Sequence, residues 1–320
     1  MLNMQQSVIA TLVFHDILNY PMTAWEVFQF QIAEDKPAAS FGDVLTMLEK
    51  LREIGEIEEK NGFYFLRARS ALVEERIERT KIAEEKWHRT RKTLSLLRMT
   101  PFIRGAALAG SIARQHTGPL SDIDFLAITQ AGRIWTGRFF LTLFALLTGR
   151  LRPGWYTRRF FPLARRGKKG SFSNKLCLSH YLATTNPVSQ NQNLYTALMH
   201  AQITPLWGME NFEEFFSVNE WIHKYLPNFE PCVLQRKTFA RSRTLSLLQG
   251  FFELPFTGPW GDLLERVLRS AQMFLIRHNP LTASPGKVAV RDTELAFHPN
   301  LRDEEVLDNF AKKMAGSYGS

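Results

Sequence analysis

The sequence predicts an α+β fold, in which a small mixed β-sheet lies between an N-terminal unit of helices with a hairpin and a helical C-terminal region. Apolar side chains at helical spacing dominate the first 55 residues, and from residue 102 to 184 the pattern follows the order β-α-β-α-β. The hydrophobic fraction of 45% is typical of a chain with a folded core. We expect four segments, with the boundaries 1–67, 68–100, 101–186 and 187–320.

The N-terminal unit, residues 1–67, combines three predicted short helices with a hairpin. Thr23 is the expected N-cap of the second helix, Gly55 the expected C-cap of the third, and Asn61–Gly62 between alternating apolar residues predicts a tight turn. This order resembles a winged helix-turn-helix. The third helix is mixed in charge and the hairpin is acidic, which favours protein–protein contact or a homodimer and leaves DNA binding as the alternative.

The next segments are read from their composition and periodicity. Residues 68–100 are rich in Glu, Arg and Lys and lack Gly and Pro, which predicts a long, mostly solvated connecting helix that ends before Pro101. Beyond residue 187 the chain is expected to be mostly helical. For the segment between them, the sequence predicts strands at 102–110, 122–129 and 175–184 and helices at 111–115 and 133–148.

The location of the protein is inferred from cysteines, the N-terminus and apolar stretches. Cys177 and Cys232 match no metal-ligand spacing, so they are expected to be two ordinary thiols in a reducing compartment. The first residues lack the pattern of a signal peptide, and we expect a cytoplasmic protein. The eleven uncharged residues 139–149 are too few for the roughly 20 that cross a bilayer, which predicts a buried helix and no transmembrane segment.

Two acids stand out in the stretch LAGSIARQHTGPLSDIDFLAIT, residues 108–129. Asp122 and Asp124 are two apart on a predicted strand, so their side chains are expected on one face of it. Like charges so close repel unless a cation lies between them, and carboxylate oxygens suit Mg²⁺ or Mn²⁺. The Gly110–Ser111 turn opens a helix whose N–H groups can receive a phosphate. Together these residues predict a site for a metal-chelated triphosphate.

The spacing of these residues resembles the signature of the polymerase-β-like nucleotidyltransferase superfamily. Gly110–Ser111, ten further residues and then Asp122–Ile123–Asp124 match it, and Ser121 and Arg114 fit its smaller stand-alone members. The resemblance covers residues 100–185 and implies a nucleotidyltransferase core. It implies that Asp122 and Asp124 hold the metal, and that the other four bind an NTP: Gly110, Ser111, Arg114 and Ser121. The implied reaction transfers a nucleoside monophosphate from the NTP to a hydroxyl of a nucleic acid or protein acceptor.

The sequence departs from this family at a third carboxylate, which active members carry on a later strand. The matching strand, 175–184, contains no acid, and residues 125–209 contain neither Asp nor Glu but eleven Lys or Arg. Three alternatives stay open. Ser179 or His180 takes over the role, with His180 as a general base; a substrate phosphate or water fills the position; or the protein is a non-catalytic nucleotide- or nucleic-acid-binding regulator with a degenerate site. Glu210, Glu213 or Glu214 folding back would also supply an acid.

A basic and aromatic stretch, residues 150–170, follows the predicted helix 133–148. Its arginines, lysines and aromatic side chains suit phosphates and exposed bases. The same composition suits an anionic membrane surface, in which case residues 138–170 would attach the protein to lipid. A solvated loop whose aromatic side chains pack on the core is the third alternative.

Overall fold

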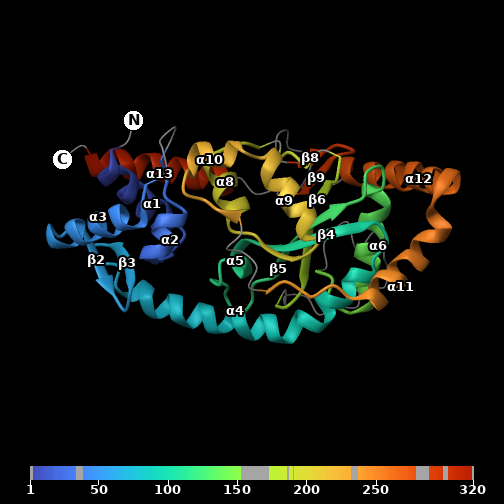
Figure 1. Ribbon diagram of the computed structural model, residues 1–320, viewed down its shortest axis with the longest axis horizontal. Helices are drawn as coiled ribbons and strands as arrows, with labels where there is room; N and C mark the ends of the chain where they lie inside the picture. The colour runs from blue at the N-terminus through green and yellow to red at the C-terminus, as the bar shows by residue number, and fades with distance from the viewer. Residues whose placement is uncertain are drawn as a thin grey trace.

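The computed structural model describes residues 3–33, 39–152, 173–185, 187–189, 191–231, 237–278, 288–297 and 302–318. Helices and strands alternate along the chain, and the strands form one three-stranded sheet, in the order β1-β3-β2, and one six-stranded sheet, in the order β7-β4-β5-β6-β9-β8 (Figure 1). The larger sheet is mixed, because β5 and β6 are parallel and its other pairs are antiparallel. The predicted α+β class with a mixed sheet is therefore confirmed.

The N-terminal unit has the predicted order of helices and hairpin. Its elements are α1 (Met4–Ile17), β1 (Met22–Thr23), α2 (Ala24–Gln29), α3 (Phe41–Glu53), β2 (Ile57–Lys60) and β3 (Phe63–Leu66). Thr23 caps α2 in a capping box with Glu26, as expected. Gly55 follows α3 with φ +76°, and the turn between β2 and β3 has φ +55° at Asn61 and +80° at Gly62, the backbone that an Asn-Gly hairpin requires.

A single long helix connects this unit to the larger sheet. Helix α4 (Ala71–Leu96) continues into η1 (Leu97–Met99) and runs along one side of the molecule (Figure 1). One side of α4 is buried and carries polar contacts: Arg76 donates to the carbonyl of Arg114, and Thr80 donates to that of Gln115. Helix α4 therefore holds the segment that follows α5 in place.

The larger sheet contains the strands that the sequence predicts and three more. The predicted ones are β4 (Ile103–Ala109), β5 (Ile123–Thr129) and β6 (Leu176–Ala183). The others are β7 (Thr204–Trp207), β8 (Val288–Val290) and β9 (Glu294–Phe297), which come from the region expected to be helical. The sheet thus takes strands from both sides of the boundary at residue 186.

Helices pack on both faces of this sheet and against one another. They are α5 (Gly110–Ala113), α6 (Ile134–Leu147), α8 (Leu194–Ala201), α9 (Met209–Val218), α10 (Trp221–Tyr225), α11 (Arg243–Glu253), η4 (Leu254–Phe256), α12 (Gly258–Arg277) and α13 (Arg302–Tyr318). Side chains alternate along β5: Leu126 and Ile128 join a core with α8, α9 and the N-terminal unit, whereas Phe125 and Ala127 join a second core with α4, α6 and α12. The N-terminal unit and one sheet face therefore share one core.

Apolar segments of the structure bear on the membrane prediction. Within the described ranges, no helix combines the length and apolar character that crossing a membrane requires. Helix α6 contains residues 139–147 of the apolar stretch and buries Leu141 and Ala145, but Leu147 is exposed, so the predicted helix is confirmed and only part of it is buried. Of the basic and aromatic stretch 150–170, residues 153–170 lie outside the described residues. The far end of the molecule exposes an apolar face on α11 and α12 that includes Phe251 and Trp260, a feature typical of interaction surfaces. The homodimer that the N-terminal unit leads us to expect stays a prediction.

Burial of His15 makes the stability of the fold depend on pH. Its Nδ1 donates to the carbonyl of Thr11 at 2.9 Å, and its Nε2 lies 3.3 Å from the amide of Gln202. Burial, helped by the charges of Arg114 and Arg76, lowers the pKa of His15 from 6.5 to about 4. Between pH 6.5 and about 4, the imidazole of His15 binds a proton in the unfolded chain but not in the folded chain. Acidification to about pH 4 is therefore expected to lower the free energy of unfolding by about 3 kcal/mol.

Urea unfolding at neutral pH and at about pH 4 measures this loss. The variant His15→Gln should lose less stability on acidification than the wild type, by the amount that His15 contributes. His88→Gln, on an exposed position of α4, is the matched control and should follow the wild type. Equal acid sensitivity of wild type and His15→Gln would show that His15 is not the group responsible.

Candidate functional site

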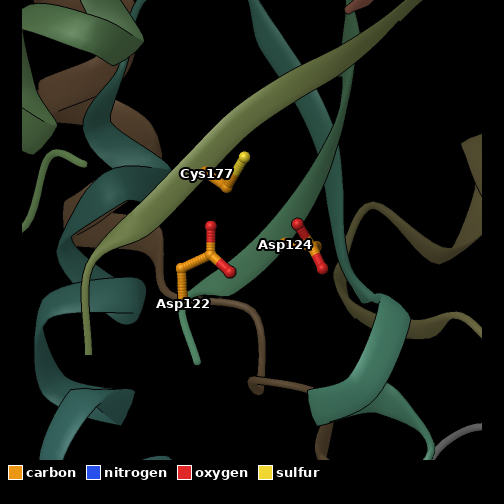
Figure 2. Close-up of side chains that lie close together, drawn as sticks. All are labelled: Asp122, Asp124 and Cys177. Atoms are coloured by element: carbon orange, nitrogen blue, oxygen red, sulfur yellow. The ribbon is translucent and has the colours of Figure 1, made fainter. Parts of the chain in front are cut away.

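The two motif acids and one cysteine converge at the end of the larger sheet. Asp122 immediately precedes β5, Asp124 lies on β5, and Cys177 lies beside it on β6 (Figure 2). One potential ligand atom from each of the three side chains lies within 4.8 Å of the other two. The three side chains are partly buried. Among the described residues, this is the group of acidic, histidine or cysteine side chains that could hold a metal ion.

The strand register explains why Cys177 joins the acids. Asp122 and Asp124 lie two residues apart and face the same side of β5, as the sequence predicts. Asp124 pairs with Cys177 in the parallel ladder and Phe125 with Leu178, but a bulge then shifts the register so that Leu126 pairs with His180. Cys177 therefore occupies the position on β6 beside Asp124, on the later strand where the nucleotidyltransferase resemblance leads us to expect a third carboxylate.

Burial and mutual repulsion set the charges of this cluster. The pKa of Asp124 is raised to about 6 by burial and by the charge of Asp122. The pKa of the Cys177 thiol is raised to about 11 by burial and by both carboxylates. The thiol therefore carries its proton at neutral pH and can donate to Asp124, while Ser179 forms a hydrogen bond with Cys177. Cys177 is a free thiol, as expected, but the sequence does not predict its place beside the acids. Cys232 lies outside the described residues.

Arg152 supplies a positive charge within the cluster. Its Nη1 forms an ion pair with Oδ2 of Asp122 and lies 3.4 Å from Sγ of Cys177. Leu151 forms an isolated bridge with Leu176 at the start of β6, and this contact brings Arg152 to the acids. A second cation, Nζ of Lys86 in α4, donates to the backbone carbonyl of Ser121, the residue before Asp122. The sequence gives Arg152 only as one member of a basic stretch.

Gly110 brings the start of α5 against Asp124. It has φ +63°, and a Cβ added there would lie 2.4 Å from Oδ2 of Asp124. Only a glycine combines this backbone with this approach. The hydroxyl of the neighbouring Ser111 lies 3.2 Å from that of Thr117. Gly110 is thus next to Asp124, and Ser111 follows it at the start of α5. The phosphate-binding role of both residues stays a prediction.

The other predicted site residues lie farther from the acids. Arg114 caps the opposite end of α5, where its Nη1 lies 3.3 Å from the sulfur of Met199. His180 is not part of the cluster: its Nε2 lies 3.1 Å from Oε1 of Glu294, a buried acid on β9. The three glutamates of α9 considered above are exposed, and none joins the cluster that the described residues form: Glu210, Glu213 and Glu214.

The comparisons with known proteins add no relative. The chain matches no family model, no curated protein and no solved structure. The resemblance to nucleotidyltransferases therefore depends on the Gly-Ser and Asp-x-Asp spacing and on the way the sheet brings these residues together.

Proposed function

We propose that the protein is a metal-dependent nucleotidyltransferase that transfers a nucleoside monophosphate from an NTP to a hydroxyl acceptor. The observation that carries this proposal is the convergence of Asp122 and Asp124 on one face of β5, with the backbone of Gly110 against Asp124. In this proposal the larger sheet is the nucleotidyltransferase core. The N-terminal unit is a winged helix-turn-helix that serves for protein contact.

The donor set fits a divalent cation. Asp124 and Asp122 place two carboxylates in a partly buried cluster, and burial together with the charge of Asp122 raises the pKa of Asp124. A bound cation would offset this repulsion. The two carboxylates would hold Mg²⁺ or Mn²⁺, with the Cys177 thiol beside them. Such an ion, when bound, polarises phosphoryl oxygens and neutralises their developing charge.

The protein's own residues position the NTP in this proposal. Gly110 lacks a side chain, so the backbone at the start of α5 can approach both Asp124 and a phosphate. Ser111 and Ser121 flank the acids, and Arg114 offsets phosphate charge from the far end of α5. Neither Cys177, a neutral thiol, nor His180, held by Glu294, replaces the missing carboxylate as an evident base. The acceptor hydroxyl is therefore expected to lose its proton to solvent or to a phosphate oxygen.

Removal and return of metal test this function. The protein, stripped with EDTA, is incubated with NTPs labelled on the α-phosphate and with RNA, DNA or the protein itself as acceptor. Incorporation is expected to be absent after stripping and to return on addition of Mg²⁺ or Mn²⁺. Incorporation that is unaffected by EDTA would contradict the assignment of the acids as metal ligands. Binding of NTP without incorporation in any acceptor would contradict transfer.

The ion pair of Arg152 with Asp122 favours a second candidate function. A guanidinium at this position neutralises the acid as a cation would, which is expected of a degenerate site. In that case the protein is a non-catalytic regulator that binds a nucleotide or nucleic acid. It would bind an NTP without turnover, and would retain nucleic acid in a salt-sensitive manner.

Replacement of Arg152 separates the two candidates. If the guanidinium takes the place of the metal, the wild type should not bind Mn²⁺ in a calorimetric titration, whereas Arg152→Gln should bind it. If the wild type is a metalloenzyme, it should bind Mn²⁺ already, and the variant should bind about tenfold more tightly, because a competing cation is lost. Lys175→Gln is the matched control, since Lys175 contacts the carbonyl of Gly149 and not the acids. An unchanged affinity in Arg152→Gln would show that the ion pair does not compete with metal.

A further inference from the structure

A pocket lies between the N-terminal unit and the larger sheet. It has a volume of about 160 Å³ and is lined by residues of α2, α4, the end of α5 and the start of β7. Helix α5 separates it from the acids: Gly110, at one end, lies against Asp124, whereas Ala113 and Arg114, at the other end, line the pocket. Figure 1 shows α5 between α2 and the sheet. The pocket is therefore distinct from the proposed metal site.

The lining of this pocket is positively charged. Arg76, Arg114 and Lys237 line it together with a single acid, Glu26. Glu26 forms an ion pair with Arg76, and Glu84, which is not a lining residue, forms one with Lys237. Burial, together with the charges of Arg79, Arg76 and Arg114, lowers the pKa of His116 to about 3. Positive charge thus exceeds negative charge around the pocket.

Buried polar atoms in the lining lack the partners that such atoms normally have. Nε of Arg76, Nε2 of Gln29 and Oε1 of Gln202 have no hydrogen-bond partner among the described residues. Each of these residues is at most 6% exposed, and all three line the pocket. Buried polar groups are nearly always hydrogen-bonded, because leaving one unsatisfied costs free energy. Two donors and one acceptor thus lie without a partner in the residues that line the pocket, which favours a polar rather than an apolar occupant.

Aromatic side chains complete the lining. The Arg76 guanidinium lies 3.9 Å over the ring of Tyr20, which holds it in place. Trp25 and Phe30 also line the pocket, and Trp25 is 46% exposed, so its ring is accessible from solvent. A fixed guanidinium, further cations and amide groups form the usual surroundings of a bound phosphate group.

We propose that this pocket binds a small phosphorylated molecule, whose phosphate is held by Arg76, Arg114, Lys237 and the amide of Gln29. The ligand contacts both α2 and the end of α5, so its binding is expected to stabilise the packing of the N-terminal unit on the sheet. This proposal uses neither acid of the metal site, and Arg114 is the one residue that it shares with the proposed NTP site.

Calorimetric titration with pyrophosphate and with adenosine monophosphate, in excess EDTA, tests the proposal on the full chain. We expect binding in the wild type and in Asp122→Asn, and affinity weaker by about tenfold in Gln29→Leu and in Lys237→Met. Gln29→Leu removes an unpartnered buried amide, so it should fold at least as well as the wild type, which thermal unfolding checks. Lys92→Met, an exposed lysine of α4, is the matched control and should bind normally.

The two probes identify the source of the phosphate. Equal affinity for both would indicate that the phosphate alone is recognised. Tighter binding of the nucleotide, reduced in Trp25→Leu, would indicate that a base also contacts the pocket. The proposal is overturned if neither probe binds the wild type, if Gln29→Leu and Lys237→Met bind as the wild type does, or if Asp122→Asn abolishes binding, since the anion would then lie at the acid cluster.

Discussion

Asp124→Asn is expected to lower nucleotide transfer by about 100-fold or more, since the substitution removes one of the two charged metal ligands. The amide has the size of the carboxylate but no negative charge, so its oxygen is a weak ligand for a hard divalent cation. The carboxylate of Asp124 also lies against the backbone of Gly110. The substitution therefore affects both the proposed metal site and the proposed phosphate site. The measurement is the rate of labelled nucleotide incorporation at saturating Mn²⁺.

The same substitution should not weaken the fold. Without a metal, Asp124 is a buried carboxylate next to Asp122, and a neutral amide removes this repulsion. The metal-free variant is therefore expected to unfold at the same temperature as the wild type or higher, which separates loss of chemistry from loss of structure. Asp308→Asn, on an exposed position of α13, is the control and should retain full activity. Transfer by Asp124→Asn at the wild-type rate would exclude Asp124 as a ligand.

The sequence predicts those parts of the fold that leave a local pattern. Strands β4, β5 and β6 are long enough to show apolar runs, and the turn at Asn61–Gly62 has a backbone preference of its own. Strands β7, β8 and β9 have three or four residues each, too few for a periodic signal. Their place in the sheet depends on the pairing of β7 with β4, of β9 with β6 and of β8 with β9, which no local preference encodes.

The sequence likewise predicts some residues of the candidate site and not others. The shared face of Asp122 and Asp124 follows from the two-residue period of a strand, and the structure places them accordingly. Cys177 was missed because a cysteine in an apolar strand resembles any core residue, and its position beside Asp124 depends on the β5–β6 register. Glu294 lies 114 residues after His180, so their contact leaves no spacing to detect. The pocket between the N-terminal unit and the larger sheet likewise combines residues from distant segments of the chain.

Gly110→Ala is expected to disrupt the site more than its size suggests. The new Cβ would lie 2.4 Å from Oδ2 and 3.2 Å from Cγ of Asp124, so either the carboxylate or the start of α5 must move. Alanine at φ +63° also costs about 1 kcal/mol or more on its own. Because the metal ligand and the proposed phosphate-binding backbone are displaced together, we expect transfer to fall by about 100-fold, with a loss of a few kcal/mol in the free energy of unfolding.

Gly132→Ala separates the two causes. Gly132 has φ +68°, but a Cβ there would meet nothing within 4 Å, so this variant carries the backbone strain without the clash. It should lose about 1 kcal/mol of stability and keep its transfer activity. If Gly110→Ala loses no more stability than Gly132→Ala and still transfers nucleotide, the carboxylate of Asp124 can leave its position without consequence. Asp124 would then not be fixed by the backbone of Gly110, and the close approach of α5 to β5 would have no role in the chemistry.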